Sequence, residues 1–176
     1  MKTVVTVICS LFFMLLHTQA KAQGKIKVDI FTNVNSFSCV CNEADFVYTE
    51  VDKNVAILFP LVQFDCPKKM MERDLLELFN ADNYPHAKLT IAEIETTKSD
   101  TEKVIKFKLT LKNISQYYKL TLSRVKYGSK TYLEGSQKVS LSDFKAVPPT
   151  KMMGLIKVED EVLISFKIPE KELLPN

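Results

Sequence analysis

The chain has 176 residues, enough for one domain with a sizeable hydrophobic core. Its 24 Lys and Arg against 21 Asp and Glu give a net charge of +3. Two of these lysines, Lys2 and Lys21, lie in the leader described next, and removing them leaves 3 − 2 = +1. This near balance gives no reason to expect nucleic acid or an acidic surface as a partner.

The N-terminus has the pattern of a cleaved signal peptide. A positive start at Lys2 is followed by an apolar run from Val4 to Leu16 and by Ala20-Lys21-Ala22, a small-x-small cleavage pattern. The run is shorter than the roughly 20 apolar residues that span a bilayer, so we expect no stable membrane insertion. We therefore expect residues 1–22 to be removed, residues 23–176 to form a single domain, and the mature protein to be periplasmic or secreted.

Three cysteines remain in the mature chain: Cys39, Cys41 and Cys66. Disulfides persist in exported proteins, and either of the first two could pair with Cys66, because residues two apart share one face of a strand. We favour Cys39–Cys66, because the two cysteines end similar tripeptides, Phe-Ser-Cys and Phe-Asp-Cys. This disulfide would close a loop of about 28 residues and contribute roughly 3 kcal/mol to stability. With one mature histidine, His86, and no Cys-x-x-Cys motif, we expect no metal site.

The first part of the mature chain predicts short strands. Ile26, Val28 and Ile30 alternate with polar residues, as in a half-buried strand. Residues 31–41 continue it or form a second strand, and residues 46–51 form a third. Residues 55–64 are apolar on both faces, so both faces must be covered, and Pro60 within them indicates a bulge or an edge position.

One segment interrupts the β pattern with helical spacing. We predict a helix at about residues 67–80, with Pro67 in its first turn and Asp65 or Cys66 as its cap. It ends before Pro85, because the residue before a proline avoids the α conformation. We expect the helix to cap an apolar interior. Its apolar stripe consists of Met71, Leu75, Leu78 and Phe79.

The remaining chain alternates with period two. The clearest strand is residues 103–112, and Ile94 falls out of phase with its strand, which indicates a bulge. Gly128 and Gly135 indicate turns, and residues 159–161 an exposed acidic turn before the last strand. The pattern is mainly β and predicts an antiparallel barrel of about eight strands with one short capping helix, closed so that no edge is exposed.

Several segments, in this order, resemble the YceI-like family of exported bacterial proteins. They are LFNADNYP at 78–85, KFKLTLKNISQYYKLTL at 106–122, VSLSDFKAVPP at 139–149 and GLIKVEDEVLISFKI at 154–168. The resemblance covers about residues 55–168. It implies an extended, lipocalin-like antiparallel β-barrel, and a similarity to proteins that hold a long polyprenyl chain inside the barrel.

The same resemblance implies which side chains bind the ligand. They are the inward residues of the barrel together with the apolar face of the helix, and no cofactor is implied. These residues are Met71, Leu75, Phe79, Ile105, Phe107, Leu109, Leu111, Tyr118, Leu120, Leu122, Val162, Ile164 and Phe166.

These observations favour a binding protein over an enzyme. The sequence has no Gly-x-Ser-x-Gly motif, phosphate-binding glycine loop or metal-ligand helix. The leading hypothesis is an exported protein that holds a hydrophobic small molecule, an isoprenoid or a fatty acyl chain. The alternative is an interaction or stress-response module of the cell envelope whose barrel is filled by its own side chains. The sequence leaves the oligomeric state open.

Overall fold

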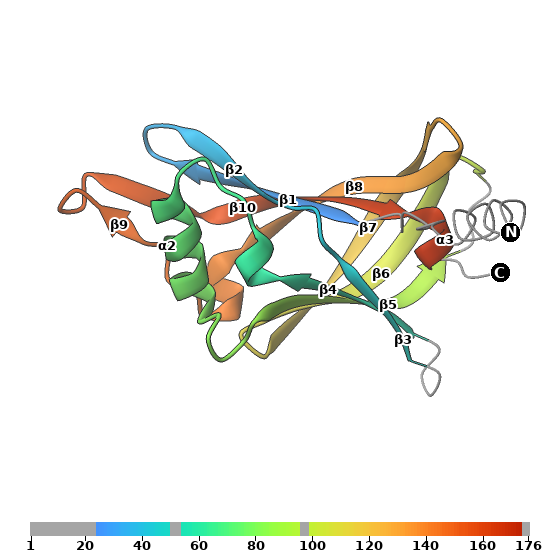
Figure 1. Cartoon of the computed structure of the whole chain (residues 1–176), viewed down its shortest axis with the longest axis horizontal. Helices are drawn as coiled ribbons and strands as arrows, with labels where there is room; N and C mark the ends of the chain where they lie inside the picture. The colour runs from blue at the N-terminus through green and yellow to red at the C-terminus, as the bar shows by residue number, and fades with distance from the viewer. Residues whose placement is uncertain (1–23, 50–53, 96–98, 174–176) are drawn as a thin grey trace, which may run out of the picture.

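One antiparallel sheet curls into a half-barrel, with a short helix across one end (Figure 1). The computed structural model describes residues 24–49, 54–95 and 99–173. Within these ranges nine strands pair in the order β2-β1-β10-β8-β7-β6-β5-β4-β3, and β9 pairs with β10. The strands are β1 (Lys25–Thr32), β2 (Ser36–Cys41), β3 (Asp45–Thr49), β4 (Asn54–Pro60), β5 (His86–Glu95), β6 (Glu102–Leu111), β7 (Ile114–Tyr127), β8 (Lys130–Ser140), β9 (Thr150–Lys151) and β10 (Ile156–Pro169).

The longest helix of the described residues is α2 (Lys69–Phe79). It is accompanied by the 3₁₀ turns η1 (Leu61–Gln63) and η2 (Leu141–Phe144) and by the four-residue α3 (Glu170–Leu173). None of the helices described here has the length and apolar character needed to cross a membrane. The prediction of a mainly β, curled antiparallel fold with a short helix is confirmed. The expected signal peptide, residues 1–22, lies outside the described residues.

Period-two alternation explains how the strands build the core. In β6, Ile105, Phe107 and Leu109 are buried on the concave face while the residues between them contact solvent. The predicted bulge in β5 is confirmed, because the register with β6 shifts between Ile91 and Glu93. The extra residue returns Ile94 to the position opposite Ile105.

Along one seam, the edge strand β2 is joined to a loop by a backbone bridge and a disulfide rather than to another strand. β2 and β3 are the two ends of the described sheet, so the expected barrel without edges is not what the strands form. Instead, Val40 of β2 exchanges two backbone hydrogen bonds with Asp65, at 2.9 and 2.8 Å. A disulfide between Cys39 and Cys66 lies beside this bridge. The segment between η1 and α2 thus takes the place of a partner for the free edge of β2.

This seam explains why the helix starts later than its sequence predicts. α2 begins at Lys69, after the extended residue Lys68, rather than at Pro67. Asp65 and Cys66 do not cap it, because their backbone and side chain are committed to β2. The helix ends at Phe79, where Asn80 adopts a left-handed conformation with φ 52°.

Pro60, predicted in a bulge or at an edge position, is the last residue of β4. It pairs with His86 of β5 but lies beyond Leu58, where the pairing of β4 with β3 ends, so its missing N–H faces no partner strand. Two other local predictions are wrong. Gly135 lies within β8, not in a turn, and a Cβ there would come within 3.0 Å of the Thr121 carbonyl oxygen. The acidic residues 159–161 belong to β10. There Asp160 accepts hydrogen bonds from the backbone N–H and the hydroxyl of Ser142, which anchors η2.

Candidate functional site

A cavity of about 380 Å³ lies at the α2 end of the half-barrel. It is bounded by α2, by the concave faces of β1, β6 and β10, and by the chain around β9. Ligand cavities in proteins span roughly 300–1,000 Å³, so this one is large enough for a small molecule or part of a long one. No polar or charged residue of the described ranges is fully buried, so the inner wall offers contacts to apolar groups.

The helix contributes its apolar stripe to this cavity. Met71, Leu75 and Phe79 lie at i, i+4 and i+8 and all three line it, as the sequence predicts for the face of a cap. Met70 and Leu78 line it as well. Only Leu75 of the helix is fully buried, so most of this wall consists of partly exposed side chains. Such a wall can repack around different apolar shapes, which suits methionine in particular.

The strands contribute four of the predicted ligand-facing residues. Leu109 and Leu111 of β6 and Val162 and Ile164 of β10 line the cavity. The remaining six predicted residues do not line it. Five of them, Ile105, Phe107, Leu120, Leu122 and Phe166, are buried in the core, and Tyr118 is partly buried against it.

Three aromatic residues of the core lie outside the cavity lining. The rings of Phe107 and Phe166 meet edge to face with 5.7 Å between centroids, and Tyr118 stacks on Phe107 at 5.5 Å. We call these three residues the aromatic floor. Leu109 lines the cavity and Phe107, two residues away on the same face of β6, does not. On this face of β6 the cavity lining therefore ends between Leu109 and Phe107.

Sequence reasoning missed part of the wall. Three of the missed residues, Ile26, Val28 and Ile30 of β1, carried a clear signal, because their alternation already indicates a buried face. Leu61, Phe64, Ala87, Val139 and Leu141 also line the cavity. Their contribution depends on how the sheet curls, which has no local signature in the sequence.

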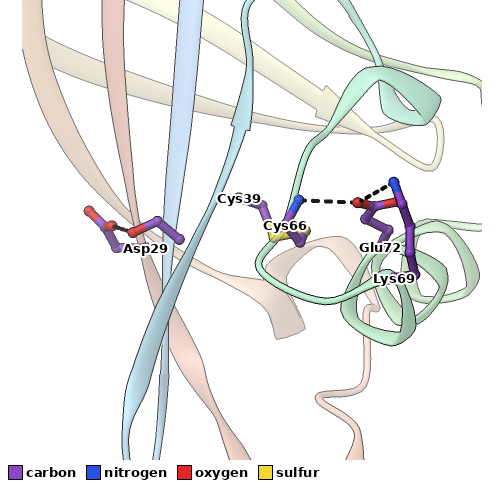
Figure 2. The surroundings of a disulfide bond; sticks show 6 residues. Asp29, Cys39, Cys66, Lys69 and Glu72 are labelled. Carbon is purple, nitrogen blue, oxygen red and sulfur yellow. Dashed lines mark hydrogen bonds and ion pairs between the residues drawn. A yellow bond between two sulfur atoms is a disulfide. The ribbon is translucent and has the colours of Figure 1, made fainter.

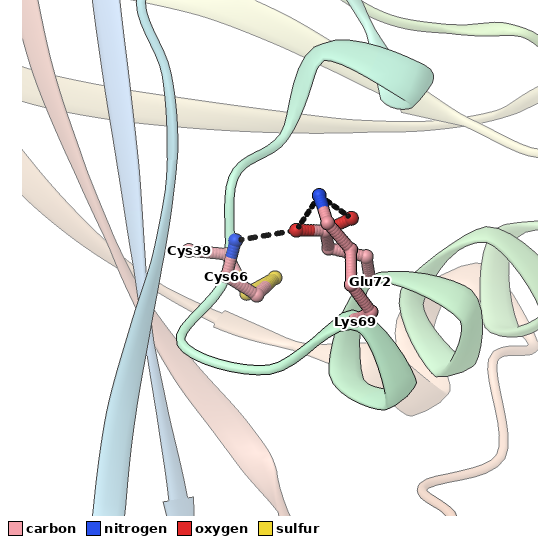
Figure 3. Close-up of polar contacts among 4 residues, drawn as sticks. All are labelled: Cys39, Cys66, Lys69 and Glu72. Carbon is pink, nitrogen blue, oxygen red and sulfur yellow. Dashed lines mark hydrogen bonds and ion pairs between the residues drawn. A yellow bond between two sulfur atoms is a disulfide. The ribbon is translucent and has the colours of Figure 1, made fainter.

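The disulfide fixes α2 over the cavity mouth. Figure 2 shows Cys39 of β2 and Cys66 meeting across the seam, and Figure 3 shows Glu72 of α2 pointing back toward Cys66. The Glu72 carboxylate accepts a long hydrogen bond from the backbone N–H of Cys66, at 3.5 Å, and bonds from Lys69 Nζ at 2.9 and 3.0 Å. The hydrogen bond from Lys69 lowers the pKa of Glu72, so its negative charge is retained on mild acidification.

The other side of β2 is held by polar contacts. Asp29 of β1, on the far side of β2 from the disulfide in Figure 2, accepts a 2.5 Å hydrogen bond from Ser38 and pairs with Lys27 at 2.8 Å. Burial acts to raise the pKa of Asp29, but these bonds outweigh it and the pKa lies below its ordinary value. β2 is thus tied on one face to β1 and on the other to the chain entering α2.

Cys41 is the free cysteine of the described residues. It is buried opposite Ile26 of β1, and its thiol donates to the Glu43 carbonyl oxygen at 3.1 Å. Burial raises the pKa of this thiol, which keeps it protonated and unreactive at neutral pH. Of the two disulfide pairings that the sequence left open, the structure has Cys39–Cys66.

Polar groups are confined to the rim of the cavity. Lys151 of β9 forms an ion pair with Asp74 of α2 at 2.7 Å, and Lys68 lies at the entrance of the helix. Within the part of the chain that is described, no cluster of three or more His, Cys, Asp or Glu side chains could hold a metal ion. The arrangement suits binding of an apolar group with a polar end at the rim.

A comparison with known protein families identifies the family to which this fold belongs. The family model described as the YceI-like domain matches residues 17–169. The chain belongs to the YceI-like family. No protein among the curated sequences matches this YceI-like chain.

Solved structures share the fold of this YceI-like protein at low sequence identity. BcnA from Burkholderia cenocepacia is 18% identical, with a TM-score of 0.65, over 83% of this chain and 95% of that one. A polyisoprenoid binding domain from Saccharophagus degradans, implicated in plant cell wall breakdown, is 8% identical, with a TM-score of 0.66, over 84% and 94%. The Campylobacter jejuni YceI protein is 17% identical, with a TM-score of 0.55, over 72% and 78%. These likenesses support the fold.

Proposed function

We propose that this protein is an exported carrier that holds the apolar chain of an isoprenoid or fatty acyl amphiphile in the cavity beneath α2. The observation that supports this most is the cavity itself: about 380 Å³, walled by aliphatic and methionine side chains, with its charged groups at the rim. Each methylene group transferred from water into such a wall contributes about 0.8 kcal/mol. A chain of about ten carbons could therefore bind firmly without a charged anchor.

Membership of the YceI-like family and the likeness to a polyisoprenoid binding domain support the same class of ligand. The N-terminal sequence and the Cys39–Cys66 disulfide support export to an oxidising compartment, the periplasm or the exterior. We assign ligand contact to the seven predicted residues that line the cavity: Met71, Leu75, Phe79, Leu109, Leu111, Val162 and Ile164. The other six predicted residues support them from the core.

The first experiment is native mass spectrometry of the mature protein purified from an export-competent host, followed by organic extraction. We expect an added mass of several hundred daltons that extracts as a lipid. A protein that is bare, and stays bare after incubation with isoprenoids and fatty acids, would refute the carrier function and favour an interaction module.

Two variants locate the ligand. Ala87 is a small residue of the cavity wall, so Ala87→Phe should fill the space and abolish the added mass. Met71→Glu places a charge at a partly exposed point of the wall, where folding tolerates it, and should weaken binding at least tenfold. Lys108→Glu, on the outward side of β6, is the matched control and should bind normally. Normal ligand retention by both cavity variants would place the ligand elsewhere.

A further inference from the structure

The cavity end of the molecule presents apolar side chains to solvent. Val34, in the turn between β1 and β2, and Met153 and Leu155, in the turn between β9 and β10, are 63%, 98% and 72% exposed. Met70 of α2 and Met152 are also exposed, and these two line the cavity as well. We call these five residues the apolar tip. It connects the solvent-exposed turns with the mouth of the cavity.

Polar bonds hold the three segments of the apolar tip together. The Asn33 amide donates to the Leu155 carbonyl oxygen at 2.9 Å, and its side-chain oxygen accepts from the Lys157 N–H at 2.9 Å. Asn33 N–H also donates to the Lys157 carbonyl oxygen at 3.1 Å, so one residue joins the β1–β2 turn to the β9–β10 turn. The Lys151–Asp74 ion pair joins the same hairpin to α2.

The β9–β10 turn displays its apolar side chains at a conformational cost. Met152 and Met153 both adopt left-handed backbone, with φ 50° and 54°, a region that residues with a side chain usually avoid. A turn with no role for its side chains would place glycine or asparagine there. Figure 1 shows the β1–β2 and β9–β10 hairpins reaching past α2 at this end of the molecule.

Lysines surround the apolar tip. Lys68 and Lys69 stand at the start of α2, and Lys151 and Lys157 flank the β9–β10 turn. Lys69 and Lys151 pair with Glu72 and Asp74. Lys68 and Lys157 are exposed and form no ion pair among the residues described, so both are free to contact an anionic group beside the apolar side chains.

We propose that the apolar tip docks the protein onto the surface of an anionic lipid bilayer, with the cavity mouth facing the membrane. Projecting apolar turns can enter the headgroup region, while flanking lysines contact anionic headgroups. An anionic lipid surface is complementary in charge to the lysines beside these side chains, whereas a second copy of the apolar tip would bring the same lysines against them. This docking goes beyond the carrier function and does not require a bound ligand.

Vesicle co-flotation of the ligand-stripped mature protein tests the proposal. The probe is vesicles of phosphatidylcholine with about one third phosphatidylglycerol, compared with phosphatidylcholine alone and with added salt. We expect binding to the anionic vesicles that weakens with salt. Leu155→Glu and Met153→Glu should each reduce it about tenfold or more, and Lys157→Ala about fivefold. Both apolar residues are too exposed for these changes to prevent folding.

Tyr48→Glu is the matched control, because Tyr48 is an exposed apolar residue on β3, toward the opposite end of the molecule. It should bind vesicles like the wild type. The proposal is overturned if the wild type does not float, or if the Leu155 and Met153 variants float as well as the control. Concentration-dependent dimerisation lost in the same two variants would assign the apolar tip to a second copy instead. Because phosphatidylcholine vesicles also supply acyl chains to the cavity, binding that requires the anionic lipid and weakens with salt reports docking rather than uptake into the cavity.

Discussion

Removal of the seam disulfide should cost the protein much of its stability. The double variant Cys39→Ala, Cys66→Ala frees a loop with a sequence separation of 27 residues. The entropy of closing a loop of that size corresponds to about 3.5 kcal/mol of unfolding free energy. Replacement of the cysteines by alanine, rather than serine, leaves no new polar group in a buried place. The rest of the seam is two backbone hydrogen bonds between Val40 and Asp65, too few to hold it alone.

Urea unfolding followed by circular dichroism measures the change. We expect the unfolding free energy to fall by about 3.5 kcal/mol and the melting temperature by about 7–14 °C. Cys41→Ala, which removes a cysteine and leaves the bond intact, is the control for the loss of buried sulfur. A double variant within about 1 kcal/mol of that control would show that the seam is held by packing rather than by the cross-link.

Two further stability predictions rest on buried polar groups. The Tyr118 hydroxyl is buried without a hydrogen-bond partner among the described residues, so Tyr118→Phe should raise the unfolding free energy by about 1 kcal/mol; a loss of stability would mean that the hydroxyl has a partner. Burial raises the pKa of the Cys41 thiol above its ordinary value of 9.0, so the unfolded chain releases this proton first. The contribution of Cys41 to stability should therefore be constant below about pH 8.5 and be lost as the pH rises through the folded-state pKa, and Cys41→Ala should reduce that alkaline fall; equal alkaline profiles would contradict the assignment.

The strand pattern was predictable from the sequence because its signal is local. Residues 103–112 alternate so regularly that strand, buried face and even the neighbouring bulge at Ile94 follow from period two. The helix was predictable for the same reason, since its apolar stripe repeats every three or four residues. Its first turn was not, because residues 65–66 are held by β2, which is remote in sequence.

The lining of the candidate cavity was only partly predictable from the sequence. Periodicity marks which side chains face inward, but it does not distinguish a packed interior from an open one. Leu109 and Phe107 have the same inward signature, yet one borders the cavity and the other belongs to the aromatic floor. The difference arises from ring size and from the partners that β7 and β10 bring into contact. Gly135 was mispredicted for the same reason. It allows β8 to approach the Thr121 carbonyl closely, and the residues next to it in sequence give no sign of that contact.

The aromatic floor has a consequence for selectivity. In the proposed carrier function, an apolar chain would occupy a depth that ends short of Phe107 and Phe166, neither of which lines the cavity. Chains shorter than that depth leave part of the wall uncovered, and longer ones leave methylene groups in water at the mouth. Both lose about 0.8 kcal/mol for each methylene that is not buried. The proposed carrier would therefore discriminate between ligands by the length of their apolar chains.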